Sequence, residues 1–458
     1  MHLGSKLRFI LALWLGKIVF ILSRMAGKQG TTLPGSIAMK LCPDLIAHLA
    51  GQLAHGTIIV TGTNGKTTTS NMLASILRKA GYRLTFNQAG SNLITGITTV
   101  FLNSSNWLGR IQTDLALLEV DEATIVKIAP LIKAHTVLVT NFFRDQLDRY
   151  GELDKTVGMV RDSIARHLPE ATMILNADDP LVAQMGKRMK NVVYYGVASN
   201  KYSSFTSEQA REAKFCSFCG GEYEYQLYHY GQLGIYACPN CDFKRPEPQI
   251  LATDINLKGI DGIEFKLGDT NIELKHQGFY NVYNALAAGA VAINLQVDPR
   301  VISQALAEFA PQAGRMEQFA YANSQITLSL VKNPTGFNEV IRAMVQTDRA
   351  LGLLIAINDN AADGRDISWL WDVDFEKLVG QAEWVVCSGS RAEDMAVRLK
   401  YAGLQSSILI IEKDLSGALE EVLERMQAEH AVYVLPTYTA LFPIRDLLSK
   451  VRSHVYAS

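Results

Sequence analysis

A glycine-rich turn between an apolar strand and a helix constrains the fold of this chain more than any other feature. Residues 57–77 read TIIVTGTNGKTTTSNMLASIL, which predicts a buried strand, then a glycine turn, then a helix. Backbone N–H groups of such a turn close around phosphate, and the helix N-terminus adds positive potential. Lys66 is placed to contact the β- and γ-phosphates, and Thr67 to hold Mg²⁺. The sequence therefore predicts a nucleotide site on a strand–turn–helix unit.

Further apolar strands with polar tips follow, in LALLEVDEA, HTVLVTNFF and TMILNADDP. Strands that alternate with helices imply a parallel sheet, whose ligands collect at the carboxyl ends of the strands. A second alternating set begins at TLSLVKNP, beyond a boundary near Pro311–Gly314. We therefore expect an α/β fold with an N-terminal helical segment over 1–50, a central domain over 51–312 and a C-terminal α/β domain over 313–458.

The composition fits a globular protein of two or three domains, with 458 residues, 48% hydrophobic and 19% charged. A net charge of −1 provides no global field that attracts nucleic acid, so we expect no nucleic-acid partner. Of the six cysteines, four cluster between Cys216 and Cys241, while Cys42 and Cys387 stand apart. That distribution favours a reducing cytosol over a disulfide-stapled secreted protein.

The clustered cysteines lie in a segment, about 203–248, that interrupts the strand–helix pattern as an inserted module. Cys216-x2-Cys219, eighteen residues and then Cys238-x2-Cys241 is the spacing of a four-cysteine zinc ribbon. Four thiolates complete a tetrahedral site and leave no open position, so the predicted Zn²⁺ is structural. A redox role for the two pairs, or nucleic-acid binding by the ribbon, remains the alternative.

The N-terminus carries an apolar run, FILALWLGKIVFILS at 9–23, with Lys6 and Arg8 before it and Arg24 after it. Lys17 splits the run, which argues against a signal peptide, and the run is short for a membrane span. Two interpretations remain open: a helix packed on the protein, or a helix lying on the membrane surface.

The phosphate turn is shorter than a general P-loop, because only two residues separate Gly62 from Gly65. This form resembles the Mur ligase and folylpolyglutamate synthetase superfamily. Further landmarks agree: Glu119 in LLEVDEA, TNFFRDQLDRYG at 140–151, LNADDP at 175–180, GFYNVYNALAA at 278–288 and Arg315 in AGRME. The resemblance implies ATP binding by Gly62, Thr63, Asn64, Gly65, Lys66, Thr67, Thr68, Glu119, Asn284 and Arg315. It places Mg²⁺ on Thr67 and Glu119, and Asn284 on the adenine side.

Two segments depart from the superfamily pattern. Gln146 stands where the family usually has His, and LVKNPTGFN at 330–338 replaces the Asp-Tyr-Ala-His-Asn-Pro run of many Mur ligases. These differences indicate that the chemistry of the acyl acceptor is not that of the usual peptide-bond-forming ligase. A third distinctive segment, NDNAADGRDISWLWDVDFE at 358–376, follows the apolar strand LGLLIAI.

The Mur-like core, the four-cysteine ribbon and this acidic segment together resemble the MurT family, the ligase-like subunits of bacterial lipid II isoglutaminyl synthase. The resemblance implies ATP-dependent amidation of the α-carboxylate of D-glutamate in the lipid II stem peptide. A GatD-like glutaminase, in a heterodimer with this chain, would supply the ammonia. It implies a cytoplasmic location, with a peripheral position at the inner face of the membrane left open. The alternatives are a Mur- or folylpolyglutamate-type amino-acid ligase, and a non-catalytic ATP- and zinc-binding scaffold.

A glutaminase with only Cys and His lacks the third group that orients the imidazole. We expect this chain to donate that carboxylate from residues 359–366, and the resemblance favours Asp366, with Asp363 as the fallback. A helix N-cap is the alternative role for such a carboxylate. The loop NQAGSNLITG at 87–96 is either a substrate seat or a plain turn.

Overall fold

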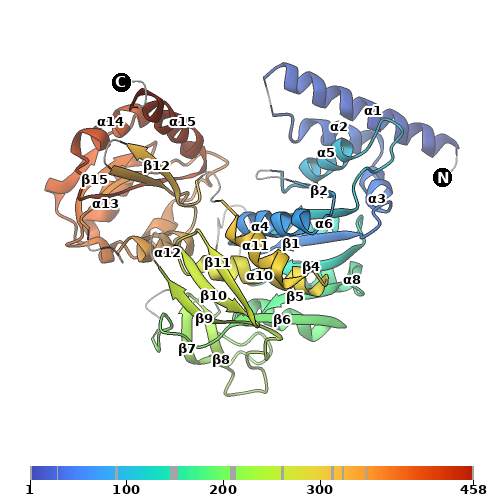
Figure 1. Cartoon of the computed structure of the whole chain (residues 1–458), viewed down its shortest axis with the longest axis horizontal. Helices are drawn as coiled ribbons and strands as arrows, with labels where there is room; N and C mark the ends of the chain where they lie inside the picture. The colour runs from blue at the N-terminus through green and yellow to red at the C-terminus, as the bar shows by residue number, and fades with distance from the viewer. Residues whose placement is uncertain are drawn as a thin grey trace.

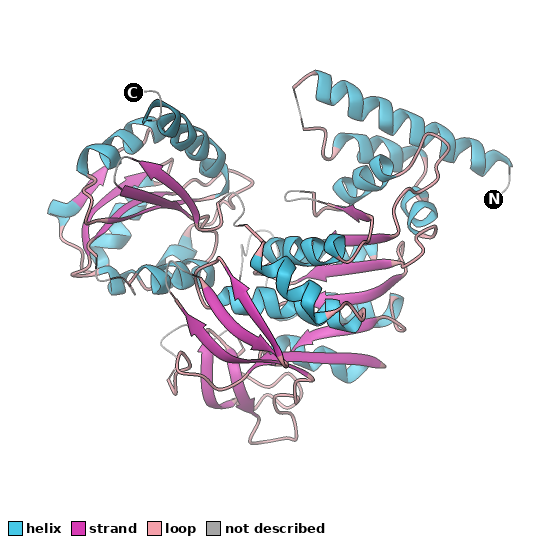
Figure 2. Cartoon of the chain, viewed as in Figure 1, coloured by secondary structure: helices cyan, strands magenta, loops and turns pink. Residues whose placement is uncertain are grey.

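The computed structural model describes residues 3–27, 29–87, 91–144, 153–206, 213–258, 262–310, 314–321, 324–345, 347 and 349–455. Over these residues the chain forms two large sheets, each flanked by helices, and one small hairpin (Figures 1 and 2). The expected α/β class is confirmed.

The first sheet has nine strands among the described residues, in the order β11-β10-β9-β6-β5-β4-β1-β3-β2. The strands from β2 to β9 in this order pair in parallel, and β9, β10 and β11 pair antiparallel at one edge. Their bounds are β1 Thr57–Thr61, β2 Leu84–Phe86, β3 Leu115–Glu119, β4 Ala134–Val139, β5 Thr172–Asn176, β6 Asn191–Val197, β9 Ile250–Leu257, β10 Ile263–Leu267 and β11 Thr270–Leu274.

Helices cover both faces of this sheet (Figure 2). One core, built on α4, α10 and α11, fills one face, and a second core under α5, α6 and α8 fills the other. All five residues of β1 are buried, as expected for a parallel strand covered on both sides. The helix bounds are α4 Lys66–Lys79, α5 Ile94–Ser104, α6 Glu122–Ile128, α8 Leu153–His167, α9 Pro180–Ala183, η1 Gln184–Arg188, α10 Tyr280–Asn294 and α11 Pro299–Ala307.

Three N-terminal helices lie over α5: α1 Leu3–Met25, α2 Leu33–Leu41 and α3 Leu45–Ala50 (Figure 1). Lys17, in the middle of α1, is buried and donates hydrogen bonds to the carbonyls of Leu102 and Ser105. The packed-helix interpretation of the N-terminal run is therefore confirmed for one face of α1. No helix among the described residues is long and apolar enough to cross a membrane.

The second sheet has six strands in the described part of the chain, in the order β12-β13-β17-β14-β15-β16. All neighbours pair in parallel except β12 and β13. The bounds are β12 Glu317–Tyr321, β13 Ser324–Leu328, β14 Leu351–Ala356, β15 Ala382–Ser388, β16 Leu409–Ile411, β17 Ala431–Pro436, α12 Pro334–Met344, η3 Ser368–Asp372, η4 Phe375–Leu378, α13 Ala392–Tyr401, η5 Ser406–Ile408, α14 Leu415–Arg425 and α15 Tyr438–Val455.

The expected inserted module appears as strands and loops around a hairpin, β7 Glu224–Tyr230 and β8 Leu233–Ala237 (Figure 2). Within the expected module of 203–248, residues 207–212 lie outside the described residues. The expected division at 312/313 also falls outside them, between α11 and β12. The domain boundaries therefore stay predictions.

Candidate functional site

The phosphate turn joins β1 to α4 at the carboxyl edge of the first sheet, and its glycines have backbones that other residues rarely adopt. Gly62 has φ 121° and Gly65 has φ 83°. A Cβ on Gly62 would collide with Thr140, and one on Gly65 would collide with Asn284. Both glycines are therefore required by conformation and by close packing, and the predicted turn lies where the sequence places it.

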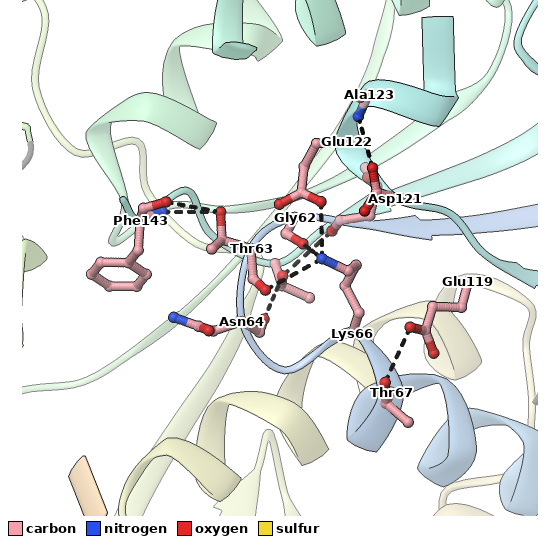
Figure 3. Close-up of polar contacts among 12 residues, drawn as sticks. Gly62, Thr63, Asn64, Lys66, Thr67, Glu119, Asp121, Glu122, Ala123 and Phe143 are labelled. Atoms are coloured by element: carbon pink, nitrogen blue, oxygen red, sulfur yellow. Dashed lines mark hydrogen bonds and ion pairs between the residues drawn. The ribbon is translucent and has the colours of Figure 1, made fainter. Parts of the chain in front are cut away.

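Lys66 begins α4 and turns back over the phosphate turn (Figure 3). Its ammonium donates to the carbonyls of Gly62 and Thr63, and pairs with Glu122 Oε2 at 2.9 Å. Burial alone would lower the pKa of Lys66, but Glu122 and the neighbouring Asp121 outweigh it and raise the pKa. The lysine is thus held as a buried cation beside the phosphate turn.

Thr67 donates a hydrogen bond to Oε1 of Glu119 at 3.1 Å, which joins the first turn of α4 to the end of β3 (Figure 3). Thr68, the next residue, is buried. Glu119 is also buried, and its Oε2 has no hydrogen-bond partner among the described residues. Burial raises the pKa of Glu119, against the opposing effects of Lys66, Thr67 and Arg315. A hydroxyl and an unsatisfied carboxylate oxygen form a donor set suited to Mg²⁺.

The two middle residues of the turn are held by the segment after β4. Thr63 exchanges hydrogen bonds with the backbone of Phe143, and its own N–H donates to Asn141 O at 2.8 Å. Asn64 N–H donates to Asn141 Oδ1 at 2.9 Å, and its carbonyl accepts from the Thr140 hydroxyl at 2.8 Å. The TNFF motif therefore fixes the turn.

The second sheet domain also reaches the turn, through the segment that departs from the Mur pattern. Asn333 donates from Nδ2 to Asn64 Oδ1 at 2.9 Å. Lys332 donates to the carbonyl of Thr63 at 3.4 Å. The phosphate turn therefore lies between the two sheets, with lysines of both domains, Lys66 and Lys332, beside it.

The two remaining nucleotide candidates, Asn284 and Arg315, come from different parts of the chain. Asn284, on α10, accepts a hydrogen bond from Thr69 and lies against Gly65, so in this structure it supports the turn from behind. Its predicted contact with adenine stays a prediction. Arg315 interacts electrostatically with Tyr280 and Glu119, and burial lowers its pKa. That position brings a guanidinium from the start of the second sheet domain to the site.

Of the remaining superfamily landmarks, LNADDP has a structural role. Asp178 accepts hydrogen bonds from Val197 N, Tyr283 and Arg245, the last at 2.6 Å. Asp179 caps α9 and accepts from Gln232 of the inserted module at 3.1 Å. Both aspartates are fully buried, and burial raises the pKa of Asp179 to about 7. They therefore anchor the inserted module to the sheet.

The four predicted cysteine ligands converge in the inserted module. All four Sγ atoms lie within 4.8 Å of one another. The Cys216–Cys241 and Cys219–Cys238 sulfur pairs are 3.7 and 3.4 Å apart. Four sulfurs at ~2.3 Å from one Zn²⁺ would be separated by ~3.8 Å, so the arrangement fits a tetrahedral metal site.

The two candidate carboxylates of the acidic segment have different surroundings. Asp363 is buried, and its two oxygens accept from the backbone N–H and the hydroxyl of Thr439, in the first turn of α15. Asp366 is partly exposed and accepts from Ser368 N–H at 2.8 Å, an interaction that lowers its pKa. The structure therefore gives Asp363 the cap role and leaves Asp366 the more accessible of the two.

A link between the domains lies next to Asp366. Arg144, which follows the TNFF motif, pairs with Asp372 of η3 at 3.5 Å. Its charge also contributes to the lowered pKa of Asp366. The acidic segment is thus electrostatically connected to the strand end that holds the phosphate turn.

The predicted substrate loop is described only in part, because 88–90 lie outside the described residues. Asn87 is buried and bonds both the N–H and the carbonyl of Glu119, so it fixes the strand end that carries the carboxylate. A substrate contact by this loop stays a prediction. Gln146, the first of the two departures from the Mur pattern, also lies outside the described residues.

Sequence reasoning missed three groups around the phosphate turn: Glu122, Lys332 and Asn333. Asn333 caps α12 by accepting from Gly336 N–H at 2.8 Å, and Pro334 occupies the first helical position. An Asn-Pro pair after an apolar strand is a helix-start signal at a strand's carboxyl end. LVKNPTGFN contains that signal, but the signal does not predict that Asn333 contacts the phosphate turn of the first sheet domain.

Two family profiles match the chain. The profile described as Mur ligase middle domain matches residues 60–240, and the profile described as MurT ligase C-terminal matches residues 330–441. The first range includes the phosphate turn and Glu119, and the second includes Asn333 and Asp366. The phosphate turn and the acidic segment therefore lie in matched sequence, whereas Asn284 and Arg315 lie between the two matched ranges.

Solved structures of Mur-type ligases have the same fold. A pseudomurein peptide ligase type C from Methanothermus fervidus superposes with a TM-score of 0.66 at 24% identity, over 86% of this chain and 78% of that one. A MurF ligase from Thermotoga maritima in complex with ADP superposes with a TM-score of 0.63 at 15% identity, over 91% of this chain and 84% of that one.

Two relatives match almost from end to end. The lipid II isoglutaminyl synthase (glutamine-hydrolyzing) subunit MurT of Staphylococcus aureus is 34% identical over 440 residues, covering 96% of this chain and 97% of that protein. The subunit of the same name from Streptococcus pneumoniae is 34% identical over 432 residues, 94% of each chain. The resemblance found in the sequence is thereby confirmed, and the chain belongs to the MurT family.

Proposed function

We propose that this chain is the ATP-using subunit of a glutamine-hydrolysing lipid II isoglutaminyl synthase. The reaction converts the α-carboxylate of D-glutamate in the lipid II stem peptide to the carboxamide of D-isoglutamine. The observation that carries the proposal is the grouping of Lys66, Thr67 and Glu119 at the phosphate turn of a MurT-family chain. The location that goes with this reaction is the cytoplasmic side of the membrane.

ATP binds at the phosphate turn, with its phosphates against the backbone N–H groups of 62–67 and the N-terminus of α4. Lys66 lies close enough to exchange its contacts with Gly62 and Thr63 for phosphate oxygens. Lys332 and Arg315 add positive charge from the second sheet domain. Cations that surround a transferring phosphoryl group stabilise the charge that develops on its oxygens.

Mg²⁺ would be held by Thr67 and Glu119, since the unpaired Oε2 of Glu119 is available to it. When bound, the ion neutralises phosphate charge and orients the terminal phosphate. Zn²⁺ at the four cysteines would have no open coordination position, and its role is to hold the inserted module folded.

The carboxylate of the substrate is a poor electrophile, so the chemistry needs a leaving group. A carboxylate oxygen attacks the γ-phosphorus and ADP leaves, which forms an acyl phosphate. Ammonia then attacks the acyl carbon, the C–O bond to phosphate breaks, and a proton is lost to give the carboxamide and inorganic phosphate. Lys66 and Lys332 face the phosphate throughout, and no covalent enzyme intermediate is needed.

The ammonia comes from a GatD-like glutaminase that forms a heterodimer with this chain. The names of the two relatives, glutamine-hydrolyzing synthase subunits, support a partner of that activity. Asp366 completes the Cys–His pair of the partner from this chain. Its partial exposure supports that role, and the hydrogen bonds of Asp363 to Thr439 argue that Asp363 holds α15 instead.

The two alternative functions differ in what they consume. An amino-acid ligase would release ADP in response to an added amino acid, without a partner. A scaffold would bind ATP and release no phosphate. The replacement of the usual Mur acceptor run by LVKNPTGFN, together with 34% identity to MurT subunits over nearly the whole chain, favours amidation over amino-acid addition.

The test is to co-purify the chain with the candidate glutaminase and incubate the complex with lipid II, glutamine, ATP and Mg²⁺. Mass spectrometry of the stem peptide should find the small mass decrease that accompanies replacement of a carboxyl by a carboxamide. A mass gain equal to one amino-acid residue would support the ligase alternative. Unchanged lipid II without phosphate release would support the scaffold.

A further inference from the structure

Helix α1 has an apolar face that nothing in the described structure covers. Its opposite face packs on the protein through Leu13 and Gly16, where Leu102 and Ala38 leave no room for a Cβ. The outward face carries one stripe at helical spacing: Leu7, Leu11, Trp14, Ile18, Leu22 and Met25, each between 43% and 80% exposed.

A neighbouring loop extends this stripe. Trp107 and Leu108 are 47% and 69% exposed, and Trp14 Nε1 donates to Trp107 O at 2.8 Å. The indole of Trp107 also lies over the ammonium of Lys17, 5.7 Å from the ring centroid. The stripe and these two residues are called the α1 apolar surface below. A contiguous exposed surface of this kind marks an interaction site more often than chance.

The charges around the α1 apolar surface identify its occupant. Residues 1–43 contain no Asp or Glu, whereas six Lys and Arg residues are present: Lys6, Arg8, Lys17, Arg24, Lys28 and Lys40. Lys6, Arg8 and Arg24 are exposed at the two ends of α1. Helices that bind an anionic bilayer surface typically combine basic residues, without acidic ones, with exposed aromatic and aliphatic side chains.

The packing of α1 sets its orientation on such a surface. Lys17 is fixed by the carbonyls of Leu102 and Ser105, so the middle of the helix is attached to α5 and the loop after it. In Figure 1, α1 forms the outer edge of the molecule, away from both sheets. Only its outward stripe is available to lipid, which favours a helix lying in the plane of the membrane.

We propose that the α1 apolar surface docks this protein on an anionic phospholipid bilayer. Leu7, Leu11, Ile18 and Leu22 enter the boundary between headgroups and acyl chains, and Trp14 and Trp107 lie at headgroup level. Lys6, Arg8 and Arg24 contact the lipid phosphates. The proposal concerns membrane contact alone and stands on these residues whether or not the proposed reaction is correct.

The test is flotation of the full-length protein with vesicles of phosphatidylcholine and phosphatidylglycerol, without nucleotide or glutamine. We expect the wild-type protein to float with these vesicles, and to float less with phosphatidylcholine alone or at high salt. The double variant Leu11→Ser/Ile18→Ser should lose binding by about tenfold or more, because two inserted side chains are removed. Lys6→Gln/Arg24→Gln should weaken binding to the mixed vesicles only.

A matched variant, Val397→Ser/Ile411→Ser, removes two similarly exposed apolar side chains from α13 and β16. It should bind vesicles as the wild type does. Equal flotation of both double variants would overturn the proposal. So would wild-type protein that ignores vesicles but dimerises in sedimentation velocity, with dimerisation lost in Leu11→Ser/Ile18→Ser. That result would make a second copy of the chain the occupant.

Discussion

Asn333 donates a hydrogen bond from its side-chain amide to Oδ1 of Asn64 across 2.9 Å, although 269 positions separate them in the chain. Asn64 lies in the phosphate turn of the first sheet domain, and Asn333 caps the N-terminus of α12 in the second. The contact therefore links the second sheet domain directly to the turn that forms the nucleotide site.

This link predicts the behaviour of Asn333→Ser. Serine keeps the helix cap, since it is as good an N-cap as asparagine, but it is too short to reach Asn64. We expect an unchanged unfolding midpoint and a KM for ATP raised by about fivefold, the worth of one hydrogen bond of ~1 kcal/mol. Asp298→Ser, the same kind of cap change on α11, should leave the KM for ATP unchanged. Equal KM values for ATP in both variants would show that the hydrogen bond of Asn333 to Asn64 does not contribute to ATP binding.

Substitutions of Asp366 and of Asp363 in the acidic segment should have different effects. Asp366→Asn keeps an acceptor oxygen for the Ser368 N–H, because the asparagine side chain also carries one, so stability should not change. Glutamine hydrolysis by the complex should be lost, while free ammonium should restore amidation. Asp363→Asn should instead lower the free energy of unfolding by about 1 kcal/mol, through its contact with Thr439. Normal glutaminase activity in the Asp366→Asn complex would show that the donated carboxylate lies elsewhere.

The cysteine cluster predicts one tightly bound metal ion per chain. Cys219→Ser should lose the metal and lower the thermal stability of the inserted module, whereas Cys42→Ser should retain the metal. Elemental analysis of gently purified protein measures the metal content, and zinc is the expected element. Metal-free wild-type protein with an intact module would contradict the assignment.

His276 predicts a pH dependence of stability. It is buried against Phe309, with ring centroids 5.2 Å apart, and neither ring nitrogen has a hydrogen-bond partner among the described residues. Burial lowers its pKa to about 4, whereas an unfolded histidine titrates near ~6.5. The unfolded state therefore binds the proton first, and stability is lost as the pH falls from ~6.5 towards 4.

The matched comparison for this prediction is His276→Phe. Through His276, the free energy of unfolding of the wild type should be about 2 kcal/mol lower near pH 5 than at neutral pH. The variant lacks the histidine and should not show this decrease. Urea unfolding of both proteins at the two pH values measures the difference. Parallel pH profiles would mean that His276 does not titrate on unfolding.

Local patterns predicted the parts of this molecule that local physics determines. The strand–turn–helix at 57–77, the parallel strands with polar carboxyl ends and the convergence of the four cysteines each follow from spacing and periodicity. Contacts between distant segments did not follow from them. The salt bridge of Lys66 to Glu122 depends on how α6 leaves β3, and Asn333 reaches Asn64 only after two domains pack. The different roles of Asp363 and Asp366 depend likewise on where α15 begins.

The most direct measurement of the central claim separates carboxylate activation from glutamine hydrolysis. Lipid II is incubated with ATP, Mg²⁺ and ammonium chloride in place of glutamine, and the stem peptide and ADP are quantified together. The wild type should form one ADP for each carboxamide, and the control Lys187→Ala, which changes an exposed lysine on η1, should do the same at the same rate. Lys66→Ala should remain folded and form neither product. Carboxamide formation by folded Lys66→Ala at the wild-type rate would contradict the claim that this phosphate turn activates the carboxylate.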